Sequence, residues 1–317
     1  MLGSALSVFN ESDDFRAALR ESGDVDLVVT GSGRFKARLS SIALQHIHLR
    51  SCEEHLPRVA FVSLAPSLVR VTLPAEPNAS LILGGIGLRA GEIATHGAGY
   101  QFHERTSGPC RWNTFWLPAR HLAISGRTMR GTNLIIPHGE RRWRPPPGAL
   151  RSLISLHGNA IRATVARQKL PVEREAARGL EQQIILALIE CLVGEATEPD
   201  GVAGRRREEI MIRFQNTLQA APLQTISVAG IANAIGISAS VLRMCCHAHI
   251  GMAPGRYLYL RRLGLVRQAL READPTESTV ARIARLHGFG GLGYFAAAYR
   301  AFFGEFPSAT LRRTTIR

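Results

Sequence analysis

The amino-acid sequence predicts an α+β protein with a mainly β, barrel- or jelly-roll-like N-terminal domain, a helical connector and an all-α C-terminal domain. Three observations support this fold class. From residue 26 to about 136, short runs rich in Val, Ile, Leu and Phe alternate with Gly, Pro, Asn and Ser, which is typical of a barrel or jelly roll. Two segments with apolar residues at helical spacing follow. One pattern then occurs twice in the last third of the chain, and each copy is typical of two helices joined by a tight turn.

The length and charge suit a two-domain protein with an anionic partner. The chain has 317 residues and a formal net charge of +14, and this length favours two domains. From residue 205 onward there are 16 basic and 6 acidic residues, against 23 and 19 before it. A basic excess in one part of the chain indicates a polyanionic partner, with nucleic acid ahead of an anionic membrane surface. The alternative is that the basic residues only keep the protein soluble.

The cysteines and the apolar runs predict a cytoplasmic protein without a membrane partner. The five cysteines are odd in number and form no Cys-x-x-Cys pair, so neither a disulfide framework nor a zinc site is expected. The first nine residues lack the basic and then apolar order of a secretory signal. The longest apolar run, from Ile184 to Val193, is about half of a bilayer span and contains Glu190.

Residues 1–147 form the predicted β-rich regulatory or effector domain. A short helix is expected near its start, with Phe15, Ala18 and Leu19 on one apolar face. Three consecutive prolines followed by Gly148 end the domain, because proline fits neither a helix interior nor a central strand. Strands are expected at Val25–Thr30, Ala43–Leu49, Val59–Ser63, Leu68–Leu73, Ser80–Leu83 and Asn113–Leu117.

Residues 148–194 form the predicted helical connector. Its second helix carries a sustained apolar stripe, which is either a homodimer contact or a face that packs on the β domain. Residues 195–209 contain Gly, Pro, Asp and Thr and are predicted to be a linker. The stripe consists of Leu180, Ile184, Leu188, Ile189 and Leu192.

Residues 210–317 contain the duplicated pattern. Val228-x-x-Ile231-Ala232-x-x-x-Gly236 returns as Val280-x-x-Ile283-Ala284-x-x-x-Gly288. The small residue lets two helices cross closely, and the glycine supplies a turn with positive φ. Ser238 is placed to cap the second helix of the first copy. These are the steric demands of a helix-turn-helix.

A long helix is predicted between the two copies. It begins at Pro254, which suits the first turn of a helix, and ends before Pro275. A rigid helix with one unit at each end fixes the distance between two recognition helices, which then match successive major grooves about 34 Å apart.

These residues resemble the DNA-binding domain of the AraC/XylS family of transcription regulators. The first copy contains Ile231-Ala232-x-x-x-Gly236-Ile237-Ser238-x-x-x-Leu242, Gly251-Met252-x-Pro254-x-x-Tyr257 and Arg262-Leu263-x-x-x-Arg267-x-x-Leu270. The second contains Ile283-Ala284-x-x-x-Gly288-Phe289 and Phe295-x-x-x-Tyr299-Arg300-x-x-Phe303-Gly304-x-x-Pro307-Ser308. The first two thirds of the chain are similar, more weakly, to the AraC-binding-like domain of that family.

The resemblance places the DNA-reading residues on the second helix of each copy. Arg243 is the residue expected to read a base, because arginine pairs bidentately with guanine, and a phosphate contact alone is the alternative. The second copy departs from the family, since Gly290, Gly291, Leu292, Gly293 and Ala297 stand where members often have polar residues. The first copy is therefore expected to supply most of the specificity. The predicted DNA-binding residues are Ser238, Ala239, Ser240, Arg243, Met244, His247, Gly291, Leu292, Tyr294 and Arg300.

Two further features are interpreted from the residues. The family usually ends in Pro-x-x-Tyr-Arg, and here Pro307-Ser308-Ala309-Thr310-Leu311-Arg312 lacks the tyrosine, so the last helix is expected to dock differently. Cys246 is interpreted as a small core residue, with a redox switch at Cys245 and Cys246 as the alternative.

Fragments of the β domain are similar to the two cupin metal-binding motifs. His46 and His48 are expected on one face of a strand, with Glu53 after them and Gly131-x5-Pro137-x-Gly139 later. The match is incomplete, because Arg142 replaces the final histidine and Ser40 the expected glycine. Polar strand residues without a metal are the preferred interpretation, and no catalytic, cofactor or metal residue is predicted. An effector pocket is a hypothesis from composition, with His96, His103, Arg105, Arg111, Trp112 and Trp116 near it.

The resemblance therefore implies a DNA-binding transcription regulator and not an enzyme. Family behaviour implies double-stranded DNA and RNA polymerase as partners, activation ahead of repression, a small-molecule effector and a homodimer. The alternatives are a metal-dependent cupin-like enzyme fused to a DNA-binding domain, and a ligand-independent architectural DNA-binding protein.

Overall fold

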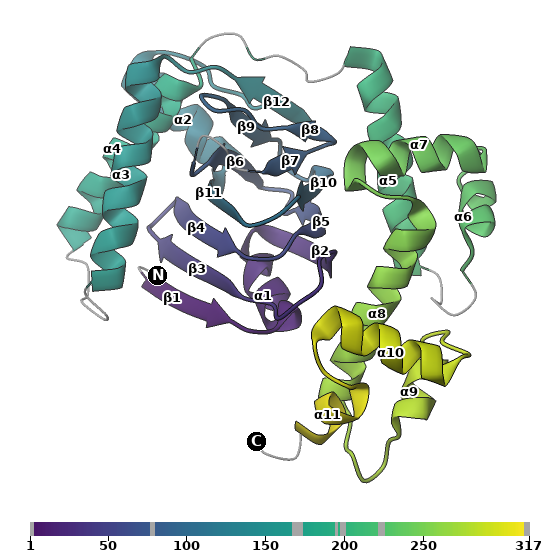
Figure 1. Ribbon diagram of the computed structural model, residues 1–317. Helices are drawn as coiled ribbons and strands as arrows, with labels where there is room; N and C mark the ends of the chain where they lie inside the picture. Colours follow the sequence, from purple (N-terminus) through teal and green to yellow (C-terminus); the bar gives the residue numbers. More distant parts are fainter. Residues whose placement is uncertain are drawn as a thin grey trace.

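The protein has a β sandwich in the middle, with helices on both of its outer sides (Figure 1). The computed structural model describes residues 3–76, 80–166, 174–193, 196, 201–220 and 226–313. Helices α2, α3 and α4 pack against one side of the sandwich, and the C-terminal helices α5 to α11 stand on the other side (Figure 1). Within the described residues, no single helix has the length and apolar composition of a membrane span.

The sandwich consists of two antiparallel sheets. One has the strand order β1-β3-β4-β11-β6-β9-β12 and the other β2-β5-β10-β7-β8, which confirms the predicted jelly-roll-like fold. The strands are β1 (Gly3–Phe9), β2 (Gly23–Val29), β3 (Ala37–Ala43), β4 (His48–Glu54), β5 (Arg58–Leu64), β6 (Leu68–Pro74), β7 (Leu81–Leu83), β8 (Ile86–Gly87), β9 (Ile93–His96), β10 (Gln101–Thr106), β11 (Cys110–Pro118) and β12 (Glu140–Trp143). Helix α1 (Ser12–Leu19) and the 3-10 turn η1 (Arg20–Ser22) precede β2, and Phe15 and Leu19 are buried as predicted.

The predicted strand Ala43–Leu49 is wrong, because the chain turns there. Ala43 pairs with His48 across the hairpin of β3 and β4. The Leu44 amide donates to the Ile47 carbonyl at 3.0 Å, which closes the turn. Leu44 and Ile47 are buried, so apolar residues that looked like part of a strand instead anchor a loop. His46 lies in this loop and not on one strand face with His48.

The structure also contains α2 (Ala119–Arg130), a helix within the region from residue 26 to about 136 that is predicted to be mainly β. Leu122, Ser125 and Gly126 face inward, and the helix ends at Gly131 with a φ of 65°. Gly131 is therefore a helix C-cap glycine. The end of α2 therefore accounts for Gly131, the first glycine of the second cupin-like fragment.

The connector packs on its own domain. Helices α3 (Pro147–Ala166) and α4 (Arg174–Cys191) are in contact with each other, α3 contacts the seven-stranded sheet and α4 contacts α2. The α4 stripe residues Ile184, Leu188, Ile189 and Leu192 are at most 2% exposed in one apolar core with the sheet. Of the two interpretations of the stripe, the structure supports packing on the β domain.

The C-terminal domain is helical throughout its described part. Its helices are α5 (Gly201–Ala220), α6 (Val228–Ala234), α7 (Ala239–Ile250), α8 (Pro254–Glu272), α9 (Val280–Leu286), α10 (Leu292–Phe303) and α11 (Pro307–Arg312). Helix α5 starts inside the segment predicted as the linker 195–209, of which residues 195 and 197–200 lie outside the described residues.

Both copies of the repeat form the same turn. Gly236 and Gly288 have φ values of 68° and 81°, the left-handed region that glycine enters at no steric cost. Helices α6 and α7 meet at 99°, within the range of a helix-turn-helix. The Ser238 hydroxyl accepts from the Val241 amide at 3.2 Å, so the predicted cap is formed.

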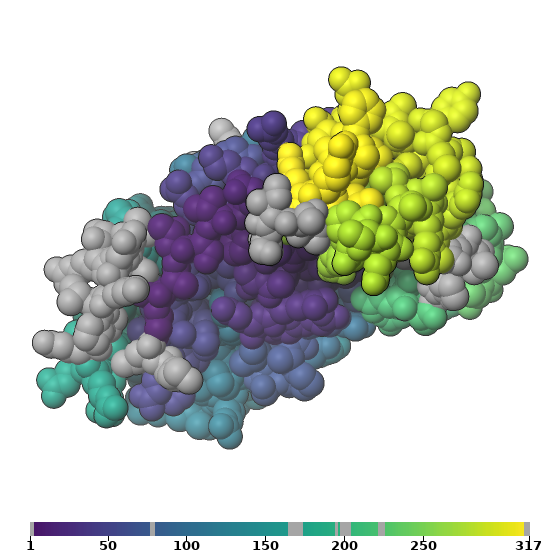
Figure 2. All heavy atoms as spheres, turned by 90° about the horizontal axis from the view of Figure 1, so that it is seen from below, coloured from purple at the N-terminus to yellow at the C-terminus, as the bar shows by residue number. Residues whose placement is uncertain are grey.

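The core of the C-terminal domain extends into the sandwich. Buried residues of α5 to α11, including Leu242, Tyr257 and Phe295, form one apolar cluster that also contains Val28 of β2 and Val59 of β5. Seen from below, yellow and yellow-green C-terminal residues lie directly against purple N-terminal residues (Figure 2). The two parts of the protein therefore share a core.

Candidate nucleic-acid interface

Helix α7 exposes a continuous face that carries the residues predicted to read DNA. Its inner face, with Leu242, Cys246 and Ile250, is buried against α5, α6 and α8. The outer face is free because these inward positions recur every four residues and leave the others to solvent. Ser238, Ala239, Ser240, Arg243, Met244 and His247 are all exposed.

Arg243 suits base readout in this position. It lies in the first half of α7, is exposed, and has no hydrogen bond or ion pair to the described part of the chain. A guanidinium on the exposed outer face of a helix can donate two hydrogen bonds to guanine. Met244 beside it is 56% exposed and offers an apolar surface for a thymine methyl group.

Cys245 and Cys246 lie on the inner side of α7. Both thiols are fully buried, and burial raises the pKa of Cys246 to about 12. Burial also raises the pKa of Cys245. Since the thiolate is the reactive form, this supports the interpretation of Cys246 as a core residue over a redox switch. All five cysteines are free thiols in buried positions.

Helix α10 exposes a face with few polar groups. Its inner residues Phe295, Tyr299 and Phe302 are buried, and its outer side carries Gly293, Ala297 and Tyr294. Tyr294 is 91% exposed. The predicted residues Gly291 and Leu292 stand at the start of the helix, where Gly291 is an N-cap without a side-chain hydrogen bond.

Arg300 lies near the opposite end of α10. It is exposed, and its guanidinium stands 4.6 Å from the ring centroid of Phe306. A charge held on a ring in this way is oriented but still accessible to a phosphate. The α10 face therefore offers a phosphate contact at Arg300 and one aromatic side chain at Tyr294, and few groups that can distinguish bases.

The last helix is held through Thr310. The Tyr299 hydroxyl lies 2.8 Å from the Thr310 hydroxyl, which donates to Glu305 at 3.0 Å. Thr310 and Leu311 are buried. The threonine that stands near the missing family tyrosine thus takes part in a buried hydrogen-bond chain under α10.

Helix α8 joins the two units, and its arginines contact the first domain. Arg261, Arg267 and Arg271 form what we call the arginine face of α8. Opposite them lies the acidic cradle, which consists of Glu11, Asp13, Asp14 and Asp26 on α1, β2 and the residue before α1. The ion pairs join Arg261 to Asp26, Arg267 to Glu11, and Arg271 to Glu11, Asp13 and Asp14.

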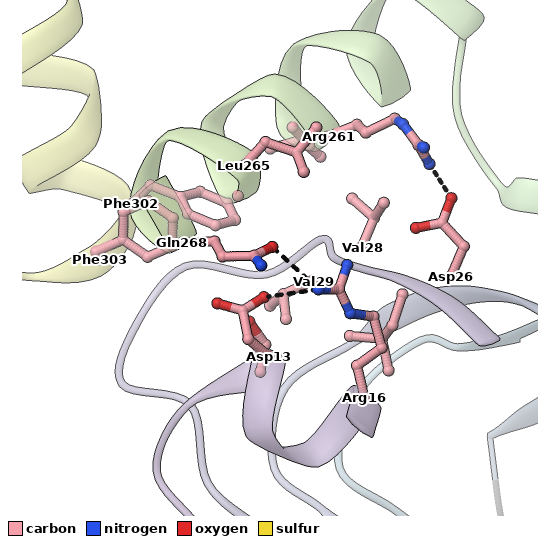
Figure 3. Close-up of a pocket in the computed structure, with 14 residues that line it drawn as sticks. Asp13, Arg16, Asp26, Val28, Val29, Arg261, Leu265, Gln268, Phe302 and Phe303 are labelled. Carbon is pink, nitrogen blue, oxygen red and sulfur yellow. Dashed lines mark hydrogen bonds and ion pairs between the residues drawn. The ribbon is translucent and has the colours of Figure 1, made fainter. Parts of the chain in front are cut away.

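Figure 3 shows the centre of this contact. Asp26 and Arg261 point toward each other, and the Arg16 guanidinium lies between Asp13 and Gln268. Arg16 donates to the Gln268 side chain at 3.0 Å, and Gln215 of α5 donates to Asp26 at 2.6 Å. The side chains of Asp26 and Arg261 are only 14% and 10% exposed, so this pair is screened little by salt.

The arginine face is thus occupied by carboxylates. Three of the basic residues in the last third of the chain are neutralised inside the protein and are not free for a phosphate. Among the described residues of the two helix-turn-helix units, the exposed arginines are Arg243, Arg282, Arg285 and Arg300.

The sandwich also contacts the end of the first recognition helix. The Arg105 guanidinium lies against Gly251, the C-cap of α7, and a Cβ on Gly85 would stand 3.1 Å from the Ala248 carbonyl oxygen. His103 of β10 is fully buried, and burial together with the nearby His249 lowers its pKa to about 3. The contact involves the end of α7 and leaves its outer face exposed.

The six residues considered for an effector pocket do not converge on one place. His103 and Arg105 face the C-terminal domain, Arg111 is a surface residue paired with Glu53, and Trp116 packs with Arg50 and His48. The other two lie inside the sandwich: Trp112 donates to Glu54, and His96 lies 3.2 Å from Glu140.

A buried charge network inside the sandwich was missed from the sequence. Arg58 pairs with both Glu54 and Glu104, and Arg70 donates to Glu104 at 2.6 Å. Burial raises the pKa of Glu104, but Arg70 and Arg58 more than offset it and bring the pKa to about 2. The strand pattern alone did not reveal it, because these charged residues occupy inward strand positions that usually hold apolar side chains.

Beside this network several buried polar atoms lack a hydrogen-bond partner among the described residues. They are Arg70 Nε, Thr72 Oγ1, His96 Nδ1 and Tyr100 Oη. Arg70 pairs with His96 across β6 and β9, and the His96 ring stacks on Tyr100 at 6.0 Å between centroids. Such atoms usually find partners in folded proteins.

The comparisons with known proteins identify a helix-turn-helix domain in this part of the chain. A family model described as a helix-turn-helix domain matches residues 231–313. The XylDLEGF operon transcriptional activator 2 of Pseudomonas putida is 30% identical over 128 residues, which cover 40% of this chain and 80% of that protein. The XylDLEGF operon transcriptional activator 3 of the same organism is 27% identical over 190 residues, 56% of this chain and 55% of that protein.

Another relative matches the C-terminal part alone. The probable thc operon regulatory protein of Rhodococcus erythropolis is 35% identical over 100 residues, 32% of this chain and 30% of that protein. This chain therefore spans 30% of the length of the thc operon regulatory protein and 55% of the length of the XylDLEGF operon transcriptional activator 3.

Two solved structures align with this chain at TM-scores below 0.5. The AraC-like transcriptional activator CuxR is 15% identical, with a TM-score of 0.43 over 83% of this chain and 94% of that chain. ToxT of Vibrio cholerae O395 is 9% identical, with a TM-score of 0.30 over 99% of this chain and 98% of that chain.

Proposed function

Because the chain belongs to the AraC/XylS family of transcription regulators, we propose that it binds specific DNA sequences and regulates transcription from nearby promoters. The observation that carries this proposal is the outer face of α7, where the predicted reading residues are exposed together on a helix whose inner face is buried. A second unit of the same build stands at the other end of α8 (Figure 1).

The two recognition helices have different tasks in this proposal. Helix α7 reads bases, mainly through Arg243, while Ser240 and His247 contact bases or phosphates. Helix α10 contacts the backbone through Arg300 and Tyr294 and responds to DNA shape. Ser238 and Gly291, at the starts of the two helices, present backbone amides toward the DNA.

The first domain regulates DNA binding through the acidic cradle. Since α8 fixes the separation of α7 and α10, any movement of α8 relative to the sandwich changes how well both helices fit one DNA face. The cradle holds three arginines of α8, and Arg105 contacts the end of α7. A small polar effector in the sandwich interior, beside His96 and Tyr100, biases this arrangement.

The remaining partners follow from the family. We propose that the protein acts in the cytoplasm as a homodimer, contacts RNA polymerase and activates transcription. Its dimer contact uses a surface other than the buried α4 stripe. Sedimentation of the purified chain tests the dimer, and transcription in vitro with and without the protein tests activation.

The test of DNA recognition is the selection of genomic fragments by the purified full chain. We expect one enriched sequence motif, with its strongest positions in one half because α7 reads more than α10. Enrichment of bent or AT-rich DNA without a motif would instead support the architectural alternative.

The cupin-like enzyme is not the function that we propose. His46 lies in a turn, Glu53 pairs with Arg111 at the protein surface, and Gly131 caps a helix. Arg142 is hydrogen-bonded to Glu140 at 2.6 Å. The residues of the two motif fragments therefore do not gather around one ion.

A further inference from the structure

Three side chains from separate elements meet on the side of the sandwich away from the C-terminal domain. His46 lies in the turn between β3 and β4, His121 on the first turn of α2, and Glu181 on α4. One imidazole nitrogen or carboxylate oxygen of each lies within 4.8 Å of the others. Residues 75 and 60 positions apart in sequence are thus brought together by the packing of α2 and α4.

The contacts within this cluster are tight. His46 Nδ1 lies 2.8 Å from Glu181 Oε1, and the His46 amide donates to Glu181 Oε2 at 3.0 Å. The rings of His46 and His121 are stacked, with 4.0 Å between centroids and 8° between planes. Within the described residues, the His121 ring makes this ring contact but no hydrogen bond. If these hydrogen bonds only joined the turn to α4, they would account for His46 and Glu181. They would not account for the position of His121.

The charge of the cluster suits a cation. Glu181 is 7% exposed, and its hydrogen bonds from described residues both come from His46. A neutral imidazole keeps a lone pair on one ring nitrogen for a bond to a metal ion. Arg120 is the nearby positive charge that acts on His121.

We propose that His46, His121 and Glu181 form a binding site for one divalent transition-metal ion, with Zn²⁺ as the first candidate. Two imidazole nitrogens and a carboxylate oxygen are ligands that Zn²⁺ takes in proteins, with a fourth position left for water. The side chain of His46 is 38% exposed, which gives solvent access to that position.

The geometry requires small movements of the ligand atoms, because His46 Nδ1 and Glu181 Oε1, which are 2.8 Å apart, must separate, and any pair closer to the 4.8 Å limit must approach. A tetrahedral zinc ion with bonds of about 2.0–2.1 Å keeps its ligand atoms about 3.4 Å apart, compared with the 4.8 Å limit within which the donor atoms lie. Rotation of the two half-exposed imidazoles supplies this movement. The bound ion connects the β3–β4 turn, α2 and α4, and so stabilises the helical side of the first domain.

The test uses the full chain, freed of metal with a chelator and then titrated with ZnCl₂ by calorimetry. We expect one zinc ion per chain and a rise of several degrees in the melting temperature at saturating zinc. His121→Gln removes one ligand but leaves the His46–Glu181 hydrogen bond, and it should weaken zinc binding at least tenfold. His48→Gln removes an imidazole two residues from His46 and outside the cluster, and should leave the affinity unchanged within twofold.

Cobalt provides a second measurement on the same proteins. Co²⁺ bound by the wild-type chain should show visible absorption bands of a four-coordinate ion, and His121→Gln should lose them. Absence of saturable zinc binding, equal zinc affinities of the wild type and His121→Gln, or thiolate-to-cobalt absorption from the cysteines would each overturn the proposal. His121 is half-exposed and has no hydrogen bond to lose, so this variant should fold, and its circular dichroism without metal checks that it does.

Discussion

Arg267 of α8 donates two hydrogen bonds to the carboxylate of Glu11, from Nε at 2.9 Å and from Nη2 at 2.8 Å. The third nitrogen of the same guanidinium donates to Glu305 at 2.8 Å, in the turn after α10. One arginine of the duplicated domain therefore joins the first domain, the connecting helix and the second helix-turn-helix unit. Arg267 belongs to the sequence motif that resembles the family, but Glu11 stands outside any motif.

We expect Glu11→Gln to weaken the contact between the first domain and α8. The substitution removes the charge that Arg267 meets in a partly buried place, which should cost about 1–3 kcal/mol of the free energy of unfolding. Urea unfolding of the full chain measures the cost, and limited proteolysis should show faster cleavage between the domains. Asp24→Asn is the matched control, because the pair of Asp24 with Arg20 is largely exposed, and such pairs contribute little.

Arg243→Ala should reduce specific DNA binding by about 1–3 kcal/mol if its guanidinium reads a guanine. Titration of a bound promoter fragment and of a scrambled fragment of equal length measures both affinities. The loss should appear for the specific fragment and remain small for the scrambled one. An equal loss for both fragments would assign Arg243 to a phosphate. Arg151→Ala, an exposed arginine on α3, controls for the change in net charge.

Gly293→Ala should stabilise α10 by about 1 kcal/mol and leave the sequence preference nearly unchanged. Gly293 lies inside the helix, has an ordinary helical φ, and a Cβ there meets no atom within 4 Å. Thermal unfolding measures the stability, and selection of DNA fragments measures the preference. Gly304→Ala is the contrasting variant, since Gly304 has a φ of 76° and alanine there should destabilise by roughly 1–2 kcal/mol. A changed preference in Gly293→Ala would contradict the passive role of the α10 face.

Acid should destabilise the protein through its buried histidines. Burial lowers the pKa of His157 to about 4, while a backbone hydrogen bond to the Arg50 carbonyl partly opposes this. A histidine whose pKa is depressed on folding contributes stability that is present above its unfolded pKa of about 6.5 and is lost as the pH falls toward the folded value.

The expected loss is about 1.4 kcal/mol per pH unit for His157 between pH 6 and pH 4. Urea unfolding at several pH values measures the slope, and His157→Gln should reduce it by about that amount. His55→Gln, at an exposed histidine, should not change the slope. An unchanged slope in His157→Gln would show that other groups cause the acid sensitivity.

The parts of the fold that depend on neighbouring residues could be predicted from the sequence. The two turns depend only on residues close in sequence, namely Gly236 and Ser238 in the first unit and Gly288 in the second. Their spacing was therefore enough to place both helix-turn-helix units. The outer face of α7 followed from the same periodicity. The alternation of apolar runs with Gly, Pro, Asn and Ser in the first domain likewise predicts a mainly β fold.

The errors concern residues whose neighbours come from elsewhere in the chain. The apolar residues Leu44 and Ile47 predict a strand around His46, but both are buried in the core that the sheet shares with α2 to α4, and the chain turns there. Helix α2 was missed because its inward face contains Ser125 and Gly126 and has few large apolar residues. The pairing of Glu11 with Arg267 joins residues 256 positions apart, and no local pattern reports such a contact.

The position of the acidic cradle near the start of the chain has a consequence for synthesis. At about 5–20 residues per second, the ribosome completes Glu11 roughly 13–50 s before Arg267. The sandwich, which is an N-terminal unit, can fold in that interval and present its carboxylates before the arginine face of α8 exists. When α8 emerges, those carboxylates are tethered on the same chain at high local concentration. The arginine face of α8 thus has its acidic partner on the same chain as soon as it emerges.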